Sequence, residues 1–220
     1  AMMDDFQKQA ERVGADIRFG LATKVDFSGP VHKVWIDEET EIHAKSVIIA
    51  TGAEAKWLGL KSEQEFQGFG VSGCATCDGF FFKNKEVVVV GGGNTAVEEA
   101  LFLTNHVSKV YLVHRRNELR AEKILQERLF SSKKIIPIWN HVLNEVVGTK
   151  EPKSVTGVHL KDVTSGQIKE IACEGVFIAI GHKPNTDIFK GQLNMDSRGY
   201  IITHSGRDGN ATATSLPGVF

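Results

Sequence analysis

Along the middle of the chain, continuous runs of hydrophobic residues alternate with segments in which hydrophobic residues recur at helical spacing. This pattern predicts alternating strands and helices. Residues 87–90 are four consecutive valines, which is typical of a strand buried on both faces of a sheet. From Asn94 to Asn105 the apolar residues recur at helical spacing. A second strand is predicted at 110–113, a helix at about 118–130, and later strands at 135–139, 155–160 and 176–180. This order predicts βαβ units around a parallel sheet.

The segments on either side of this region have a different pattern. Residues 31–36 alternate with period two, and residues 46–52 read as an apolar strand ending in a turn of small residues, Ala50, Thr51 and Gly52. A backbone can approach a ligand closely at such a turn, but residues 1–56 contain no glycine-rich phosphate loop. The segment 181–220 is rich in turn signals. We therefore divide the chain into 1–56, 57–180 and 181–220, with a self-contained middle domain and two parts of an incomplete one.

The overall charge excludes some classes of partner. The 220 residues include 26 basic and 27 acidic side chains, so no general electropositive surface points to nucleic acid. No apolar run reaches the roughly 18 residues that a membrane span requires, and the first residues lack the features of a signal peptide. Three cysteines are too few for a disulfide scaffold. These features predict a cytoplasmic protein that acts without a membrane.

A glycine-rich turn directly follows the run of valines and indicates a dinucleotide site. Gly91 permits the tight turn, Gly93 lets the main chain approach a pyrophosphate, and Ala96 keeps the following helix close to the sheet. The helix start at Asn94 and Thr95 offers free N–H groups to the phosphates. A glycine-rich hairpin is the alternative, but it does not explain the helical periodicity that follows.

A basic cluster about twenty residues after this turn indicates which nucleotide binds. An NAD site usually has a carboxylate there, whereas this chain has His114, Arg115 and Arg116, followed by Arg120. Guanidinium groups bind a 2′-phosphate, and each charged hydrogen bond contributes roughly 1.5–3 kcal/mol. Two such bonds favour NADPH over NADH by about a hundredfold or more. The alternative is a solvated helix start, but the position at the end of the second strand favours NADPH.

The pair Cys74 and Cys77 has the spacing of a redox couple or of half a zinc site. Tetrahedral zinc needs two further ligands, and the only other cysteine, Cys173, is isolated. Redox chemistry is therefore favoured over zinc, with two idle buried thiols as a third possibility. Asp78, next to Cys77, is a candidate proton donor and acceptor or else a turn aspartate. Cys173 is interpreted as a structural thiol.

Together these motifs resemble one known family. Residues 74–81 resemble the active-site stretch of low-molecular-weight bacterial thioredoxin reductase, and residues 91–100 resemble its NADPH loop and helix. His114–Arg116 with residues 120–123 is similar to its 2′-phosphate site, and residues 180–186 resemble the segment that leads back into its flavin domain. The similarity covers nearly the whole chain. It implies a Rossmann-like NADPH-binding domain inserted in a partial FAD-binding domain of the two-dinucleotide-binding flavoprotein type.

The resemblance also implies an activity and roles for particular residues. Electrons pass from NADPH through FAD to the Cys74–Cys77 disulfide and then to thioredoxin. Cys77 faces the flavin, Cys74 attacks the thioredoxin disulfide, and Asp78 handles protons. Ala50, Thr51 and Gly52 lie against FAD, while Ile180 and Gly181 lie near the nicotinamide. The family also suggests a homodimer.

Two departures from the family pattern leave other functions open. Family members begin with a flavin-binding glycine motif and have a Gly-Asp flavin motif near their end, and this chain has neither. We therefore expect an internal portion of a longer protein that binds NADPH but is colourless when isolated. One alternative is the flavoprotein reductase partner of a peroxiredoxin, against which Arg115 and Arg116 argue. Another is a non-catalytic NADPH-binding or redox-sensing module.

Overall fold

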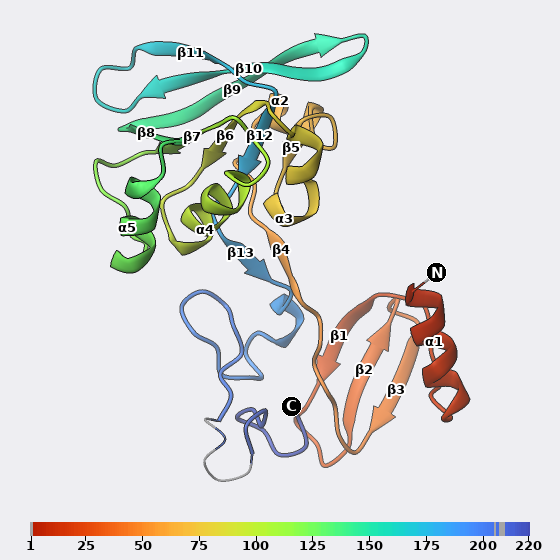
Figure 1. Ribbon diagram of the computed structural model, residues 1–220. Coiled ribbons are helices and arrows are strands. Elements are labelled where there is room, and N and C mark those ends of the chain that lie inside the picture. The colour runs from red at the N-terminus through yellow and green to blue at the C-terminus, as the bar shows by residue number, and fades with distance from the viewer. Residues whose placement is uncertain (1, 205, 207–209) are drawn as a thin grey trace. The chain divides into compact units, whose positions relative to one another are not determined.

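The structure, a computed structural model, describes residues 2–204, 206 and 210–220 and divides into two compact units (Figure 1). The smaller unit comprises residues 1–52 with 184–220, and the larger unit comprises residues 53–183. The larger unit is therefore inserted in the sequence of the smaller one. The predicted fold class, an α/β domain inserted in a second domain, is confirmed by this division and by the parallel sheet described next.

A five-stranded, entirely parallel sheet forms the centre of the larger unit. Its strands, in spatial order, are β5 (Val71–Ser72), β12 (Gly175–Ile178), β6 (Glu86–Val90), β7 (Lys109–His114) and β8 (Ile135–Trp139). The strands predicted at 87–90, 110–113 and 135–139 are confirmed within one residue. The strand predicted to reach Ile180 ends at Ile178, because the chain then turns outward and exposes Ile180.

Successive valines of β6 point to opposite faces, as a strand requires. Val87 and Val89 belong to a core that includes α4 (Asn94–Leu103), whereas Val88 and Val90 belong to a second core under an antiparallel sheet. All four are buried. Figure 1 shows the two layers: α4 and α5 (Lys123–Ser131) lie on one side of the parallel sheet, and the antiparallel sheet lies on the other. The continuous apolar run exists because both faces are covered.

The antiparallel sheet consists of β9 (His141–Lys150), β10 (Lys153–Asp162) and β11 (Ile168–Ala172). Sequence patterns predicted only the centre of β10, and β9 and β11 were missed. The register between β9 and β10 shifts between Val155 and Gly157, and again between His159 and Leu160. Such irregularities interrupt the period-two alternation from which a strand is predicted.

The helix predicted to begin near Glu118 begins instead at Lys123. Residues 119–121 stay non-helical because they fold over the glycine turn, where the Arg120 N–H donates to the Gly92 carbonyl at 2.7 Å. The Glu122 N–H donates to the Asn94 side chain at 2.9 Å. These contacts fix the segment that carries the basic residues beside the turn. Three further short helical segments of this unit are α2 (Lys61–Glu65), α3 (Ala75–Asp78) and the 3-10 helix η1 (Gly79–Phe82).

The smaller unit contains α1 (Met2–Arg12), a three-stranded antiparallel sheet and the 3-10 helix η2 (Asp187–Phe189). The strands of this sheet are β1 (Ala22–Asp26), β2 (His32–Ile36) and β3 (Thr40–Ala44). The apolar strand predicted at 46–52 is wrong. In the described part of the chain this segment makes one isolated bridge, Val47 to Val219, and Ile48 is 81% exposed. The main chain of this segment is hydrogen-bonded to residues 218–220 and to Asn185, and in the described residues it forms no continuous ladder with another strand.

Two short strands form a separate ribbon, β4 (Ala53–Ala55) with β13 (His182–Pro184). Nearby, the Lys56 N–H donates to the Gly181 carbonyl at 2.9 Å. The ribbon therefore joins the two chain segments at which the larger unit begins and ends. In the residues that the structure describes, no helix is long and apolar enough to cross a membrane.

Candidate functional site

A pocket of about 410 Å³ opens where β6 passes through the glycine turn into α4. This volume lies within the range of small-molecule and cofactor sites. The pocket joins residues predicted from separate motifs, and these are Gly91, Gly93, Thr95, His114, Arg115, Arg120, Ile180 and Gly181. It lies at the carboxyl ends of the central parallel strands, which is where ligands bind in open α/β sheets.

The three glycines of the turn have different surroundings. A Cβ atom on Gly91 would lie 2.6 Å from the Cβ of Ala96, and one on Gly92 would collide with the His114 ring. A Cβ on Gly93 would meet nothing within 4 Å. Gly91 and Gly92 are therefore required for packing, whereas Gly93 leaves open space at the start of α4. That space is what a phosphate group needs to reach the main-chain N–H groups of a helix start.

The basic residues around the pocket divide into two groups. Arg115 and Arg120 are exposed and line the pocket, whereas Arg116 does not line it. His114 is buried, and burial followed by the charge of Arg120 lowers the pKa of its imidazole. A neutral His114 packed under Gly92 supports the turn rather than supplying charge. The guanidinium groups that can meet an anion in the pocket are those of Arg115 and Arg120.

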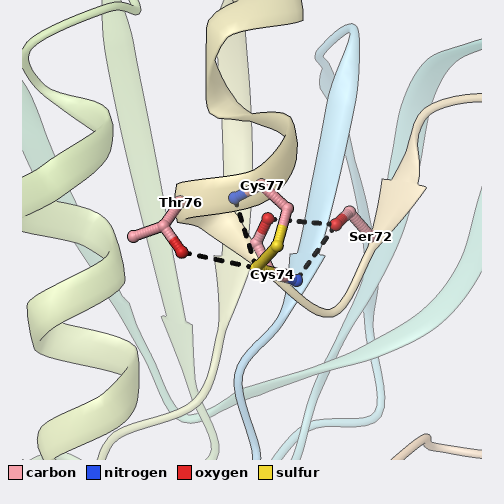
Figure 2. The surroundings of a disulfide bond; sticks show 4 residues. All are labelled: Ser72, Cys74, Thr76 and Cys77. Atoms are coloured by element: carbon pink, nitrogen blue, oxygen red, sulfur yellow. Dashed lines mark hydrogen bonds between the residues drawn. A yellow bond between two sulfur atoms is a disulfide. The ribbon is translucent and has the colours of Figure 1, made fainter. Parts of the chain in front are cut away.

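Cys74 and Cys77 form a disulfide at the start of α3, with their Cα atoms 5.3 Å apart (Figure 2). The Cys77 N–H donates to the Cys74 sulfur at 3.2 Å, and the Thr76 hydroxyl lies 3.4 Å from the same sulfur. Ser72 accepts a hydrogen bond from the Cys74 N–H at 3.0 Å and donates to the Cys74 carbonyl at 3.3 Å. The residues around Cys74 therefore hold it through both its main chain and its sulfur. Cys77 is exposed, and Cys74 and Asp78 are half-buried.

The redox pair and the pocket are linked through helix packing. Helix α3 packs against α4, the helix that begins at the glycine turn. Glu99 on α4 is half-buried, and its Oε2 atom is fully buried. Burial raises the pKa of Glu99 to about 7.

The third cysteine lies apart from the disulfide. Cys173 is buried, and burial, reinforced by the charge of Glu174, raises the pKa of its thiol to about 12. It is therefore a thiol and not a thiolate near neutral pH. Among the described residues, no group of three or more His, Cys, Asp or Glu side chains could hold a metal ion.

Comparison with known proteins identifies the family. The family described as pyridine nucleotide-disulphide oxidoreductase matches residues 3–220. The thioredoxin reductase of Rickettsia conorii is 58% identical over 219 residues, which cover 100% of this chain and 69% of that protein. The chain belongs to the thioredoxin reductases of this family. The sequence-based resemblance and the assignment to the disulfide oxidoreductases are thus confirmed.

Solved thioredoxin reductases share the fold of this chain. The enzyme from Giardia duodenalis has 38% sequence identity and a TM-score of 0.82, with 100% of this chain and 70% of that chain covered. The enzyme from Lactococcus lactis, in the FR conformation, has 38% identity and a TM-score of 0.78, with coverage of 98% and 69%. The similarity therefore extends through both units of the chain.

Some residues predicted for the cofactor sites lie outside the pocket. Asn94 and Ala96 are at the start of α4, and Ala96 is buried against the sheet. Ala50, Thr51 and Gly52 are exposed and belong to the smaller unit. Their segment is held by Asn185, which donates to the carbonyls of Thr51 and Gly52 at 3.1 and 3.0 Å.

Sequence reasoning missed several residues of this thioredoxin reductase site. Leu58 and His141 line the pocket from distant parts of the chain, and no local motif marks them. Ser72 binds the main chain of Cys74 beside the disulfide. Only Gly92 had a signal in the sequence, because it stands between two glycines that were assigned roles.

The two glycines Gly92 and Gly93 are expected to respond oppositely to substitution. Gly92→Ala forces a methyl group into the His114 ring and should destabilise the protein by about 1–3 kcal/mol. Gly93→Ala meets no neighbour, so the melting temperature should stay near that of the wild type. Its methyl group occupies the space for the pyrophosphate, and NADPH affinity should fall about tenfold or more. Thermal melts and NADPH titrations measure both effects; unchanged NADPH affinity in Gly93→Ala would remove the turn from the site.

The raised pKa of Glu99 predicts a pH dependence of stability. The folded protein keeps the proton on Glu99 up to about pH 7, whereas the unfolded chain releases it near pH 4.5. The contribution of Glu99 to the free energy of unfolding is therefore largest below pH 4.5 and is lost as the pH rises through 7. As the pH rises from 4.5 to 7, the free energy of unfolding of Glu99→Gln should therefore increase relative to that of the wild type by about 1–2 kcal/mol, after allowance for solvent screening. Urea unfolding at both pH values measures this change. The adjacent exposed Glu98, changed to Gln, is the control, and an equal pH dependence in both variants would contradict the assignment.

Proposed function

We propose that this chain carries the NADPH site and the redox disulfide of a thioredoxin reductase, in which electrons pass from NADPH through FAD to Cys74–Cys77 and then to the disulfide of thioredoxin. One observation carries the proposal. The Cys74–Cys77 disulfide lies on α3, and α3 packs on the helix that starts at the nucleotide turn. Membership of the thioredoxin reductases supports the same electron path.

The residues around the pocket fit NADPH. The open space at Gly93 and the helix start at Asn94 suit the pyrophosphate, and Arg115 and Arg120 suit a 2′-phosphate. Ile180 and Gly181 form the part of the pocket that we assign to the nicotinamide. Bound NADPH would supply a hydride at this pocket, and a bound flavin would supply the two electrons that reduce the disulfide. Arg116 is left with a lesser role, because it does not line the pocket.

The cysteines exchange electrons by thiol–disulfide chemistry. Two electrons break the Cys74–Cys77 bond, and the two sulfurs take up two protons in all. We assign Cys74 to the attack on the thioredoxin disulfide and Cys77 to the side of the flavin. The Cys77 N–H and the Thr76 hydroxyl both lie within hydrogen-bonding distance of the Cys74 sulfur, and such contacts favour a thiolate there. Asp78, one residue beyond Cys77, is the proposed proton carrier.

The wider assignments follow from the family. We assign 57–180 to the NADPH domain and assign 1–56 with 181–220 to the FAD domain. Ala50, Thr51 and Gly52 are exposed, which suits contact with one edge of a flavin, but three residues do not enclose one. We further propose that the protein is a cytoplasmic homodimer that acts on thioredoxin and binds neither nucleic acid nor a membrane.

The test is reduction of thioredoxin by the chain with NADPH and added FAD, followed by the same assay with NADH. Oxidation of NADPH that depends on thioredoxin supports the proposal. Binding of NADPH without reduction of any disulfide would favour a non-catalytic module. Equal or better activity with NADH and a peroxiredoxin would favour the peroxiredoxin-linked alternative.

A further inference from the structure

Glu63, at the third position of α2, is a fully buried carboxylate. One of its oxygens accepts a hydrogen bond from the Leu58 N–H at 2.9 Å, and the other accepts one from the Gly59 N–H at 2.7 Å. Burial of a carboxylate is unfavourable unless its oxygens are hydrogen-bonded. Both oxygens of Glu63 are bonded, and their donors are two consecutive main-chain groups. Glu63 therefore holds the main chain at residues 58 and 59.

The two hydrogen bonds of Glu63 extend beyond the helix that contains it. In a capping box, the acidic side chain at the third helical position accepts a hydrogen bond from the N–H of the N-cap residue. Glu63 instead reaches past the N-cap Leu60 to the two residues before it. Gly59 has a φ angle of 80°, in the left-handed region that favours glycine. Glu63 thus fixes a turn that leads into α2, and not the start of α2 alone.

The turn held by Glu63 forms part of the wall of the nucleotide pocket. Leu58 lines this pocket together with Ile180 and Gly181. Two residues before Leu58, the Lys56 N–H donates to the Gly181 carbonyl at 2.9 Å. Two residues of extended chain span at most about 7 Å, so Leu58 lies near Gly181. Leu58 is therefore part of the end of the pocket that we assign to the nicotinamide.

The guanidinium groups that suit the 2′-phosphate lie at the other end of the pocket. Arg115 directly follows β7, whereas Ile180 follows β12, and β6 lies between these two strands. Neighbouring strands are about 4.8 Å apart, so the two ends of the pocket are separated by about 10 Å. A displacement of Leu58 would therefore change the nicotinamide end and leave the adenosine end as it is.

Helix α2 is itself bonded to the antiparallel sheet. The Ser62 hydroxyl of α2 accepts a hydrogen bond from the Val146 N–H of β9 at 3.0 Å, and α2 packs against β9 (Figure 1). The first three residues of β9, 141–143, also line the pocket. Glu63 therefore connects the Leu58 wall of the pocket to a helix that is bonded to the strand forming a second wall.

We infer that Glu63 is a positioning residue for the nicotinamide: its carboxylate holds the main chain at Leu58 and Gly59, so that the Leu58 side chain stays in place as a wall of the pocket. The inference rests on the proposed function, because it requires that the pocket bind NADPH. A carboxylate suits this task, since it has two acceptor oxygens and no donor. Glutamine has one acceptor oxygen, so in its place one of the two N–H groups loses its partner.

The experiment compares the binding of two nucleotides to the 220-residue chain and to its variants. The nucleotides are NADPH and adenosine 2′,5′-bisphosphate, which has the adenosine and the 2′-phosphate but no nicotinamide. Glu63→Gln should lower the affinity for NADPH by about tenfold and change that for adenosine 2′,5′-bisphosphate by less than about twofold. Leu58→Ala removes the wall itself and should show the same selective loss. Glu65→Gln, at an exposed position of α2, is the control and should bind both nucleotides as the wild type does.

Equal losses for both nucleotides in Glu63→Gln, or no loss for either, would overturn the inference. Should Glu63→Gln not fold, hydrogen exchange of residues 57–60 in the wild type is measured by mass spectrometry with each nucleotide bound. Slower exchange with NADPH than with adenosine 2′,5′-bisphosphate supports the inference, and equal exchange overturns it. A wild-type chain that binds neither nucleotide overturns the proposed function itself.

Discussion

Changing Cys74 to serine should lower the rate of NADPH-dependent thioredoxin reduction by at least about a thousandfold, and Cys77→Ser should do the same. Under the proposed function each sulfur is required, because electrons would leave the flavin into a disulfide and would reach thioredoxin through a thiolate. The Cys77 N–H that donates to the Cys74 sulfur remains in both variants, so the local main chain is kept. Binding of NADPH should be unaffected, since neither cysteine lines the nucleotide pocket.

The measurement is steady-state oxidation of NADPH with thioredoxin, paired with an NADPH titration. Cys173→Ala is the matched control, because the thiol of Cys173 is buried and protonated. Trapping with thioredoxin separates the roles of the two cysteines. A mixed disulfide formed by Cys77→Ser supports attack by Cys74, whereas a mixed disulfide formed only by Cys74→Ser would reverse the assignment. Turnover that survives either change would contradict the relay.

The double change Arg115→Ala with Arg120→Ala should reduce the preference for NADPH over NADH by about a hundredfold. Both guanidinium groups line the pocket, and each removed charged hydrogen bond to a 2′-phosphate costs about 1.5–3 kcal/mol. The Arg120 main-chain bond to Gly92 does not depend on the side chain, so the turn should persist. NADH binding should change little, because NADH has no 2′-phosphate.

Titration of each variant with NADPH and NADH measures the preference, and Arg128→Ala, an exposed arginine on α5, is the control. Arg116→Ala should have a smaller effect than Arg115→Ala, since Arg116 does not line the pocket. A larger effect of Arg116→Ala would restore the assignment made from sequence alone. Unchanged selectivity in the double variant would move the 2′-phosphate site elsewhere.

Local sequence patterns were sufficient to predict an element or a site where one short segment alone provides all of its residues. The valine run predicted β6 because a strand covered on both faces is apolar throughout. The glycine turn and the Cys74–Cys77 spacing predicted a phosphate-binding start of α4 and a redox pair, and the structure contains both the helix and the disulfide. The pattern failed at 46–52, where an apolar segment makes an isolated bridge and no continuous ladder among the described residues, and in β9 and β10, where register shifts disrupt the alternation.

The sequence alone determined the chemical groups of this protein: a dithiol, a phosphate-binding turn and a set of guanidinium groups, each encoded within a few residues. The tertiary structure decided which of these groups meet. It placed Arg120 over Gly92, because residues 119–121 fold back on the turn and do not continue a helix. It also left Arg116 outside the pocket. In addition, it packed α3, which begins at the redox pair, on α4, which begins at the nucleotide turn. Burial and proximity between distant segments depend on how elements pack, and no local spacing of residues specifies that.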